Sequence, residues 1–261
     1  MRQAVIYRGT WHLATYARDL GNALGIRTVR ALPSKWVERY REDHTVVNWG
    51  TTEQIYLGSG LVGRVINKPA SVIMNINKLT TLTVLRHNGI SVPRFTTDRD
   101  EAIAWSVGGA DVIARTILRG SRGEGIVVVR PGHAMPQARL YTEYFNGSRE
   151  YRVHVFRGNP EAHVSQKRRR NGSEPSPDGL MIRNGGPDWV FCPNRVTTPP
   201  PAMVAACHGS RSALGLDFAA FDCRAKRDGS FVILESNTAP GFEGSTLDWY
   251  ETNVRRLLNA G

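Results

Sequence analysis

Three oxygen-bearing side chains near the end of the chain have the spacing of a metal site. Glu235 and Asn237 follow the apolar run at 232–234, and Asp222 lies in the apolar segment before them. The Asp-Gly dipeptide at 228–229 is typical of a two-residue β-hairpin turn, and such a turn would set Asp222 directly opposite Glu235. Because side chains alternate along a strand, Asn237 would lie on the same face as Glu235.

Paired carboxylates in this position predict a site for a hard divalent cation. Two bare carboxylates ~5 Å apart repel each other by about 3 kcal/mol at an effective dielectric constant of about 20. A fold compensates for such a pair with a buried proton, an arginine or a metal ion. The oxygens of Asp222, Glu235 and Asn237 suit Mg²⁺ or Mn²⁺ that is shared with phosphate groups. The alternative is a surface hairpin end with solvated acids, if the register is off by one or two residues.

A glycine-rich segment between two apolar runs predicts a loop that contacts phosphate groups. Its small residues are Gly120, Ser121, Gly123 and Gly125. The segment lacks the Gly-Lys-Ser or Gly-Lys-Thr of a Walker loop, but a flexible hairpin can still place backbone N–H groups over phosphates. An ordinary glycine-rich hairpin is the alternative. Arg115, before this segment, and Lys78, at the head of a predicted helix, are candidate phosphate contacts, with a solvated lysine as the alternative for Lys78.

The segment at 140–153 predicts a hinge between two strands. Glu143, Tyr144 and Phe145 end the first strand, and Glu150 opens the second. A hinge strand can offer backbone donors and acceptors to an adenine ring, and the carboxylate of Glu150 can bind ribose hydroxyls. Together with the phosphate contacts, these residues predict a nucleotide site.

The elements that must position these side chains alternate between short strands and short helices. Strands at 3–7 and 45–50 and a helix at 13–24 predict a small α/β lobe at the N-terminal end. Asn77 as N-cap and Gly89 as C-cap bound a second helix. The remaining predictions are helices at 101–107, 200–216 and 246–258, strands at 111–118, 126–130, 139–145, 151–156, 218–224 and 231–236, and polar loops with short strands over 168–200.

Composition places the chain among globular proteins with a substantial core. The 261 residues are 41% hydrophobic, which is ordinary for one large domain or for two or three lobes. No apolar run reaches the ~18 residues that span a membrane, and the N-terminus lacks a signal-peptide pattern. The three cysteines form no Cys-x-x-Cys pair, which argues against a metal–thiolate site and favours a reduced, cytoplasmic chain.

The formal net charge of +11 favours polyanionic partners such as nucleotides, nucleic acids or acidic peptides. The one dense basic run covers 167–170, and a solvated turn explains it as well as a phosphate contact does. Trp11, Trp36 and Trp49 could stack on bases, so a nucleic-acid-binding protein without turnover is one alternative. Tryptophans of this kind more often belong to a core.

Taken in order, the motifs resemble those of the ATP-grasp superfamily over roughly 77–247. The most specific stretch is ESNTAPG at 235–241, which is similar to the Glu-x-Asn-x-x-Pro-Gly signature of D-alanine–D-alanine ligases and ribosomal-protein glutamate ligases. Its continuation, PGFEG, looks closer to the glutamate ligases. The resemblance implies an α/β fold of α+β lobes: a small N-terminal α/β domain over 1–76, a central lobe with the glycine-rich loop over 77–142, and a C-terminal lobe with the metal site over 143–261.

The resemblance also implies that ATP binds between the central and C-terminal lobes. Its phosphates would contact Lys78, Arg115 and the glycine-rich loop. Its adenine would be lined by residues 143–145, and its ribose would be bound by Glu150.

The same resemblance assigns the residues at the reacting end of the nucleotide. Two Mg²⁺ or Mn²⁺ ions would be held by the oxygen triad, Asp222, Glu235 and Asn237. Arg183 and Asn184, in MIRNGG, resemble a basic-polar motif near the γ-phosphate. Lys167 is expected to assist Arg183 in stabilising the transferring phosphoryl group.

The sequence departs from the family pattern at two positions. The strand lysine that precedes the glycine-rich loop is replaced by Arg115, which keeps the charge and can bind phosphate through two donors. D-alanine ligases carry an arginine two positions before the metal-binding aspartate, where this chain has Ala220. The second departure argues against a D-alanine ligase.

These implications favour a carboxylate–amine ligase that forms an amide or peptide bond through an acylphosphate. Its substrates would be small-molecule or peptide carboxylates and amines, and a homodimer is common for the family. The main alternative within the same fold is a phosphotransferase that stops at phosphorylation of a small acceptor. Nucleic acid is a less favoured partner, and no membrane partner is expected.

Overall fold

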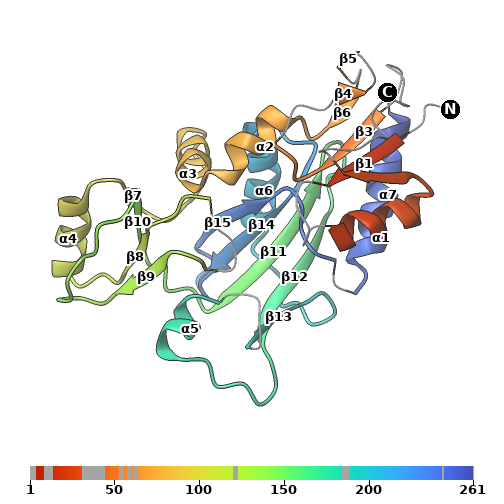
Figure 1. The fold of residues 1–261 in the computed structure, drawn as a ribbon. Helices are drawn as coiled ribbons and strands as arrows, with labels where there is room; N and C mark the ends of the chain where they lie inside the picture. Colours follow the sequence, from red (N-terminus) through yellow and green to blue (C-terminus); the bar gives the residue numbers. More distant parts are fainter. Residues whose placement is uncertain are drawn as a thin grey trace.

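The computed structural model describes residues 4–8, 14–30, 45–52, 56–57, 60–61, 64–119, 123–183, 188–242 and 244–260. In this part of the chain the strands form three larger sheets and one two-stranded sheet (Figure 1). A parallel sheet lies at the N-terminal end, and two antiparallel sheets follow it along the sequence. This arrangement confirms the predicted α/β class with α+β lobes.

The N-terminal sheet is parallel, and the last helix of the chain completes its core. Its strand order is β2 (Arg27–Arg30), β1 (Ala4–Arg8), β3 (Thr45–Trp49), β6 (Arg64–Ile66). The two-stranded sheet is formed by β4 (Tyr56–Leu57) and β5 (Gly60–Leu61). The helices of this lobe are α1 (Ala14–Leu24) and α7 (Thr246–Asn259). Leu20, Trp49, Tyr250 and Leu257 belong to one buried hydrophobic cluster, so α7 packs with α1 and β3.

A four-stranded antiparallel sheet forms the middle of the molecule. Its strand order is β7 (Phe95–Thr96), β10 (Leu140–Glu143), β8 (Val112–Arg115), β9 (Ile126–Val129), and the helices of this region are α2 (Pro69–Ile76), α3 (Lys78–His87) and α4 (Arg99–Val107). As predicted, the Asn77 side chain caps α3 by accepting the Thr80 N–H, and Gly89 just after the helix has a φ of 70°. Helix α2 is absent from the prediction; it begins at Pro69, a residue favoured at the first helical position.

The largest sheet has five antiparallel strands and carries the predicted metal site. Its strand order is β13 (Trp189–Cys192), β12 (Ala162–Arg169), β11 (Arg149–Phe156), β14 (Phe218–Ala225), β15 (Phe231–Asn237). Helix α6 (Pro201–Ala213) packs on one face, and the short α5 (Pro177–Met181) lies near the end at which β11 begins (Figure 1). Arg168 and Arg169 continue β12, so the stretch predicted as loops begins two residues later.

The β14–β15 hairpin differs from the prediction at its turn and agrees with it at the site. The Lys226 N–H donates to the Ser230 carbonyl at 2.8 Å, so the loop has three residues, with Gly229 at a φ of 89°. A β-bulge at Leu234 then adds one residue to β15. The extra turn residue and the bulge compensate, and Asp222 pairs with Glu235 as predicted.

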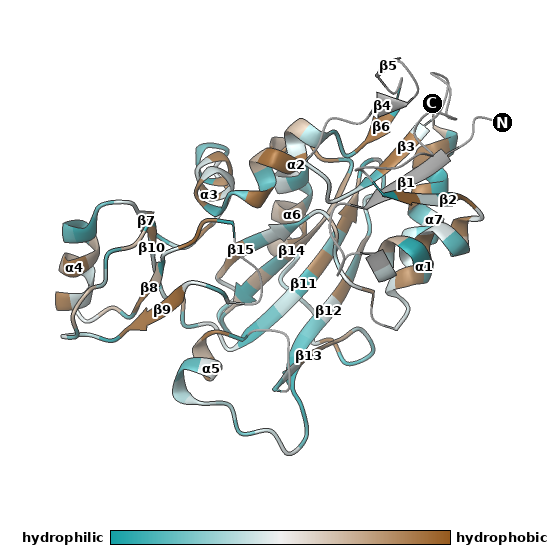
Figure 2. Cartoon of the chain, viewed as in Figure 1, coloured by the Kyte–Doolittle hydropathy of each residue, from teal (hydrophilic) through white to brown (hydrophobic). Residues whose placement is uncertain are grey.

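The strands of the large sheet are divided between apolar and hydrophilic halves. Figure 2 shows hydrophilic colour on the halves of β11 and β14 that lie toward α5, and hydrophobic colour nearer the N-terminal lobe. The hydrophilic half of β11 contains Arg149, Glu150 and Arg152, and that of β14 contains Asp222 and Arg224. Within the described residues, no helix has both the length and the apolar character needed to cross a membrane.

Asn67 joins the N-terminal sheet to the large sheet from a fully buried position. It has a φ of 60°, and its side chain accepts the backbone N–H groups of Asp217 at 2.7 Å and Phe218 at 3.1 Å. Its amide also donates to the Phe218 carbonyl at 2.9 Å. A left-handed backbone is costly for most residues, and asparagine is among those that tolerate it best.

We therefore expect Asn67→Ala to lower the free energy of unfolding by about 3 kcal/mol, because two buried N–H groups lose their acceptor and the left-handed backbone becomes less favourable. Urea denaturation followed by circular dichroism measures this change. The matched control is Asn88→Ala at an exposed position, where we expect a loss of about 0.5 kcal/mol or less. A cost below about 1 kcal/mol for Asn67→Ala would contradict this structural role.

Candidate active site

A cavity of about 950 Å³ opens between the two antiparallel sheets and reaches the N-terminal lobe at Tyr16 and Gly50. Its wall brings together the predicted residues Lys78, Arg115, Gly123, Glu143, Tyr144, Phe145, Glu150, Lys167, Arg183, Asp222, Glu235 and Asn237. Gly125 lies in the same loop as Gly123, beside the wall. The predicted residues Gly120, Ser121 and Asn184 lie outside the described part of the chain.

One face of the large sheet carries its polar side chains in rows that cross the strands. The first row is Lys167, Glu150 and Arg224. The second row, two residues along each strand, is Arg152, Asp222 and Glu235. The third row is His163, His154, Ala220 and Asn237. Directly paired residues have Cβ atoms about 5 Å apart, so this register gathers charges from four separate segments of the sequence.

Asp222 is ionised and held by an arginine from the neighbouring strand. Its two carboxylate oxygens accept from Nε and Nη2 of Arg152 at 2.7 and 2.9 Å. Burial alone would raise the pKa of Asp222, but the Arg152 guanidinium outweighs burial and holds this pKa below its ordinary value. The Arg152 guanidinium also lies over the Phe191 ring at 4.0 Å, which fixes its orientation.

Glu235 and Asn237 complete the predicted oxygen triad from β15. The Glu235 carboxylate is 3.1 Å from Nζ of Lys78, at the start of α3, so this ion pair joins the central region to the large sheet. The Asn237 side-chain oxygen accepts the Ala239 N–H at 3.0 Å, in the turn that follows β15. All three oxygen-bearing side chains line the cavity.

The donor set fits a hard divalent cation. Asp222, Glu235 and Asn237 offer only oxygen atoms, which Mg²⁺ and Mn²⁺ prefer. Arg152 and Lys78 place positive charge beside the two carboxylates, where a metal ion would also neutralise them. Among the described residues, no cluster of three or more His, Cys, Asp or Glu side chains has metal-binding geometry, so two carboxylates and one amide are the whole candidate set.

The predicted phosphate contacts Lys78 and Arg115 belong to the central lobe and also line the cavity. Burial lowers the pKa of Arg115, and nearby Glu235 partly opposes that shift. The β8–β9 hairpin continues past Arg115, because the Thr116 N–H donates to the Gly125 carbonyl at 2.9 Å. A Cβ atom on Gly125 would lie only 2.7 Å from Thr116 Oγ1, so a residue without a side chain is needed there.

The hinge is tied into the central sheet by its backbone. The Glu143 N–H donates to the Arg94 carbonyl and the Tyr144 N–H to the Asp111 carbonyl, both at 2.9 Å. Arg224 lies over the Tyr144 ring at 5.3 Å. Lys226 lies over the Phe145 ring at 4.8 Å, so both hinge aromatic rings pack against cations of β14 and its turn.

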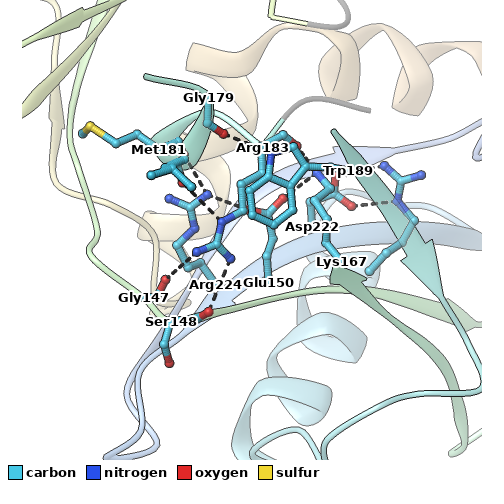
Figure 3. Close-up of polar contacts among 12 residues, drawn as sticks. Gly147, Ser148, Glu150, Lys167, Gly179, Met181, Arg183, Trp189, Asp222 and Arg224 are labelled. Atoms are coloured by element: carbon cyan, nitrogen blue, oxygen red, sulfur yellow. Dashed lines mark hydrogen bonds and ion pairs between the residues drawn. The ribbon is translucent and has the colours of Figure 1, made fainter. Parts of the chain in front are cut away.

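Glu150 is buried within a cluster of cations (Figure 3). Its carboxylate oxygens contact Nζ of Lys167 and Nη2 of Arg224, each at 2.6 Å. Arg183 approaches the same cluster from the segment after α5. The ribose contact expected of Glu150 stays a prediction.

The histidine row and the cysteines have structural roles. His154 is buried, and its Nδ1 lies 3.1 Å from the Tyr250 hydroxyl; burial holds the pKa of His154 well below its ordinary value. His163 Nε2 lies 3.1 Å from Thr246 Oγ1. Cysteines 192, 207 and 223 are free, and the reduced state expected from the sequence stays a prediction.

Arg152 and Arg224 are site residues that the sequence reasoning misses. Each is a direct cross-strand partner of a predicted acid, Arg152 of Asp222 and Arg224 of Glu150. Arg152 also lies two residues after Glu150, and Arg224 lies two residues after Asp222. That i, i+2 spacing places them on the face of the predicted acids, and it is the signal that could identify them.

Comparison with known proteins identifies a relative by sequence. No family model matches the chain. N-acetylaspartylglutamate synthase A from Homo sapiens is 26% identical over 197 residues, which are 69% of this chain and 47% of that protein. The chain therefore spans about half the length of this relative.

Solved structures share the fold over nearly the whole chain. A D-alanine–D-alanine ligase from Bacillus anthracis has a TM-score of 0.65 at 14% identity, covering 99% of this chain and 100% of that one. The ATP-grasp ligase PsnB, complexed with a minimal precursor, has a TM-score of 0.63 at 13% identity, covering 94% and 93%. A Chryseobacterium gregarium RiPP-associated ATP-grasp ligase, in complex with ADP and a leader and core peptide, has a TM-score of 0.63 at 14% identity, covering 99% and 96%.

These similarities identify the fold. Each of the matched chains is an ATP-grasp ligase or a D-alanine ligase by its description, and each is covered almost completely. The chain has the ATP-grasp fold, which is the fold that the sequence predicts.

The Arg152–Asp222 pair gives a prediction for the nucleotide-free protein. We expect Arg152→Met to cost about 3 kcal/mol of unfolding free energy, because it leaves the largely buried Asp222 without a counter-charge. Adding Asp222→Asn should recover about 1–2 kcal/mol of that loss. Urea denaturation of the wild type, both single variants and the double variant measures the coupling.

The exposed pair Arg255–Glu251 is the matched control for this cycle, with an expected coupling of about 0.5 kcal/mol or less. Strictly additive costs for Arg152→Met and Asp222→Asn would show that the two side chains do not depend on each other.

Proposed function

We propose that the protein is an ATP- and Mg²⁺-dependent ligase that joins a carboxylate to an amine in an amide or peptide bond. The observation that carries this proposal is the facing pair Asp222 and Glu235, which the sheet register turns toward a cavity in an ATP-grasp fold. The sequence similarity to human N-acetylaspartylglutamate synthase A supports the same class of reaction. The fold similarity to peptide-binding ATP-grasp ligases is consistent with it.

ATP would bind across the cavity with its two ends on different walls. The adenine would lie against residues 143–145 at the hinge, with the ribose near Glu150. The phosphates would extend toward Lys78, Arg115 and the glycine-rich loop at Gly120, Ser121, Gly123 and Gly125. The buried guanidinium of Arg115 favours this direction, because a phosphate would supply the counter-charge that burial makes valuable.

The metal would be held by Asp222, Glu235 and Asn237, and two ions, Mg²⁺ or Mn²⁺, are expected. When bound, these ions neutralise the charge of the phosphate oxygens. Arg152 keeps Asp222 ionised and oriented toward the cavity, and Lys78 forms an ion pair with Glu235. The carboxylates are thus ready to act as ligands before nucleotide arrives.

The reaction would proceed in two displacements. An oxygen of the substrate carboxylate attacks the γ-phosphorus of ATP, ADP leaves, and an acylphosphate forms. The nitrogen of the amine then attacks the acyl carbon, inorganic phosphate leaves, and the nitrogen gives up a proton.

The protein's contribution to both displacements is positioning and charge neutralisation, without a covalent enzyme nucleophile. Arg183 and Lys167, with Asn184, would stabilise the transferring phosphoryl group. The glycine-rich loop would close over ATP and exclude water, because water competes with the amine for the acylphosphate.

The substrates are proposed to be small-molecule or peptide carboxylates and amines. A phosphotransferase that releases a phosphorylated acceptor is the alternative, and intact mass spectrometry separates that product from a condensed one. Nucleic-acid binding is less favoured, since Trp49 is fully buried against Phe218 and Tyr250 and its ring is not available to stack on bases. A homodimer and a cytoplasmic location stay predictions from the sequence.

We expect phosphate release from ATP to require a carboxylate, an amine and Mg²⁺ together, and to stop when EDTA removes the metal. We expect Glu235→Gln to lower this rate by a factor of about 100 or more, because a metal ligand and a charge are both lost. A coupled phosphate-release assay across panels of carboxylates and amines measures both effects.

The matched control is Glu101→Gln, which removes a surface carboxylate paired with Arg94 and should leave the rate unchanged. Full activity of Glu235→Gln would refute the metal assignment. Phosphate release that needs a carboxylate and no amine would favour the phosphotransferase.

A further inference from the structure

Glu150 occupies the centre of a buried charge cluster with more cations than acids. Its row on the sheet contributes Lys167 and Arg224, and both of their side chains are within 2.6 Å of its carboxylate oxygens. The side chains of Glu150, Lys167 and Arg224 are 4%, 6% and 5% exposed. Removing the Glu150 carboxylate would leave both buried cations without this counter-charge.

The two cations also reach past the sheet to the end of α5 and to the residues that follow it. Nη2 of Arg224 donates to the Met181 carbonyl at 3.0 Å, and Nζ of Lys167 donates to the Arg183 carbonyl. Figure 3 shows Glu150 below this segment, between the two cations. Residues 176–183, here called the strap, are therefore tied to the sheet through side chains that Glu150 neutralises.

The strap carries the Arg183 guanidinium to the edge of the cavity. Nη1 and Nη2 of Arg183 lie 3.4 Å from the Ser148 and Gly147 carbonyls, immediately before β11. The guanidinium also lies 5.0 Å from the Trp189 ring, whose Nε1 donates to the Gly179 carbonyl at 3.0 Å. In the described part of the chain no carboxylate forms an ion pair with Arg183, so its contacts leave its charge available to an anion.

The strap touches the central lobe as well. Asp178, in its helix, accepts from Nη2 of Arg130 at 3.0 Å, and Arg130 follows β9. The strap therefore contacts both lobes: Lys167 and Arg224 of the C-terminal lobe at one end, and Arg130 of the central lobe at the other. Its position depends on the buried cluster at one end and on an exposed ion pair at the other.

We propose that Glu150 is a positioning residue that holds the strap through Lys167 and Arg224 and thereby sets the Arg183 guanidinium for an anionic ligand of the cavity. This inference rests on the proposed function for the identity of that ligand, an ATP phosphate group. It differs from a direct ribose contact, because Glu150 would act on the ligand through the two cations that its oxygens hold and through the strap. Arg224 depends on the same contacts, since among the described residues its buried Nε has no hydrogen-bond partner and its Nη2 donates to Glu150 and Met181.

The first experiment needs no nucleotide and therefore tests the positioning separately from the proposed function. We expect Glu150→Gln to raise hydrogen exchange of the Leu180 and Ile182 amides about tenfold, because their bonds to Ser176 and Asp178 lie in the released strap. Mass spectrometry of peptides that cover the strap measures this exchange. Exchange that stays at the wild-type rate would overturn the proposal.

Two further variants keep this experiment decisive. Glu251→Gln is the control, because it removes a carboxylate 2.9 Å from Arg255 on α7, and the strap should be unaffected. Arg224→Lys serves if Glu150→Gln does not fold: it keeps the charge but shortens the reach to Glu150 and Met181. It should also raise exchange in the strap, and wild-type exchange in this variant would count against the proposal.

The second experiment separates positioning from ribose binding. Calorimetric titration with ATP, 2′-deoxy-ATP and 3′-deoxy-ATP, each with Mg²⁺, is carried out on the wild type, Glu150→Gln, Arg183→Gln and the double variant. We expect Glu150→Gln to weaken the binding of all three nucleotides by the same factor, about tenfold. In the Arg183→Gln background, adding Glu150→Gln should not weaken binding further. A loss that disappears with a deoxy nucleotide identifies a ribose contact, and additive losses with Arg183→Gln show independent action; either result overturns the proposal. If the wild type binds no nucleotide, the proposed function fails, and the hydrogen-exchange experiment still tests the positioning.

Discussion

The register of the large antiparallel sheet is the constraint on which the site depends. Pairing of β11 with β14 sets Glu150 opposite Arg224 and Arg152 opposite Asp222, and pairing of β14 with β15 sets Asp222 opposite Glu235. A shift of one residue in any of these strands would turn its charged side chains to the opposite face. The apolar face packed on α6 opposes such a shift, because the same movement would expose its core residues.

Charge pairing explains how acids can line a cavity before any ligand arrives. Asp222 is held by Arg152, Glu235 by Lys78, and Glu150 by two cations at once. The partners come from neighbouring strands or from α3, so each acid has a counter-charge within the protein. The excess of basic residues in the sequence is therefore partly an internal feature of the site, and only part of it faces solvent.

Local features of the sequence predict much of the fold. The capping residues of α3, the hairpin that joins β14 to β15 and the polar end of β15 all follow from spacing within a few residues. The facing pair Asp222–Glu235 follows as well, although the turn has one more residue than a two-residue hairpin and the bulge at Leu234 restores the register. Two local departures cancel here, and sequence pattern alone does not reveal either of them.

Long-range pairing limits what the sequence can predict about the site. Arg152 and Arg224 act through partners some 70 residues away, and the register that joins them depends on packing across the whole sheet. The strap depends in the same way on contacts from β12, β13 and β14 and from the central lobe. Residue type identifies the acids as candidates, but only the assembled sheet shows which cation holds each acid.

The location of the metal ion tests this account most directly. Crystals grown with Mn²⁺ and a non-hydrolysable ATP analogue give an anomalous signal wherever the ion binds. The account predicts a peak bonded to carboxylate oxygens of both Asp222 and Glu235 and to phosphate oxygens of the nucleotide. A well-ordered nucleotide whose phosphates and metal lie away from both carboxylates would contradict it.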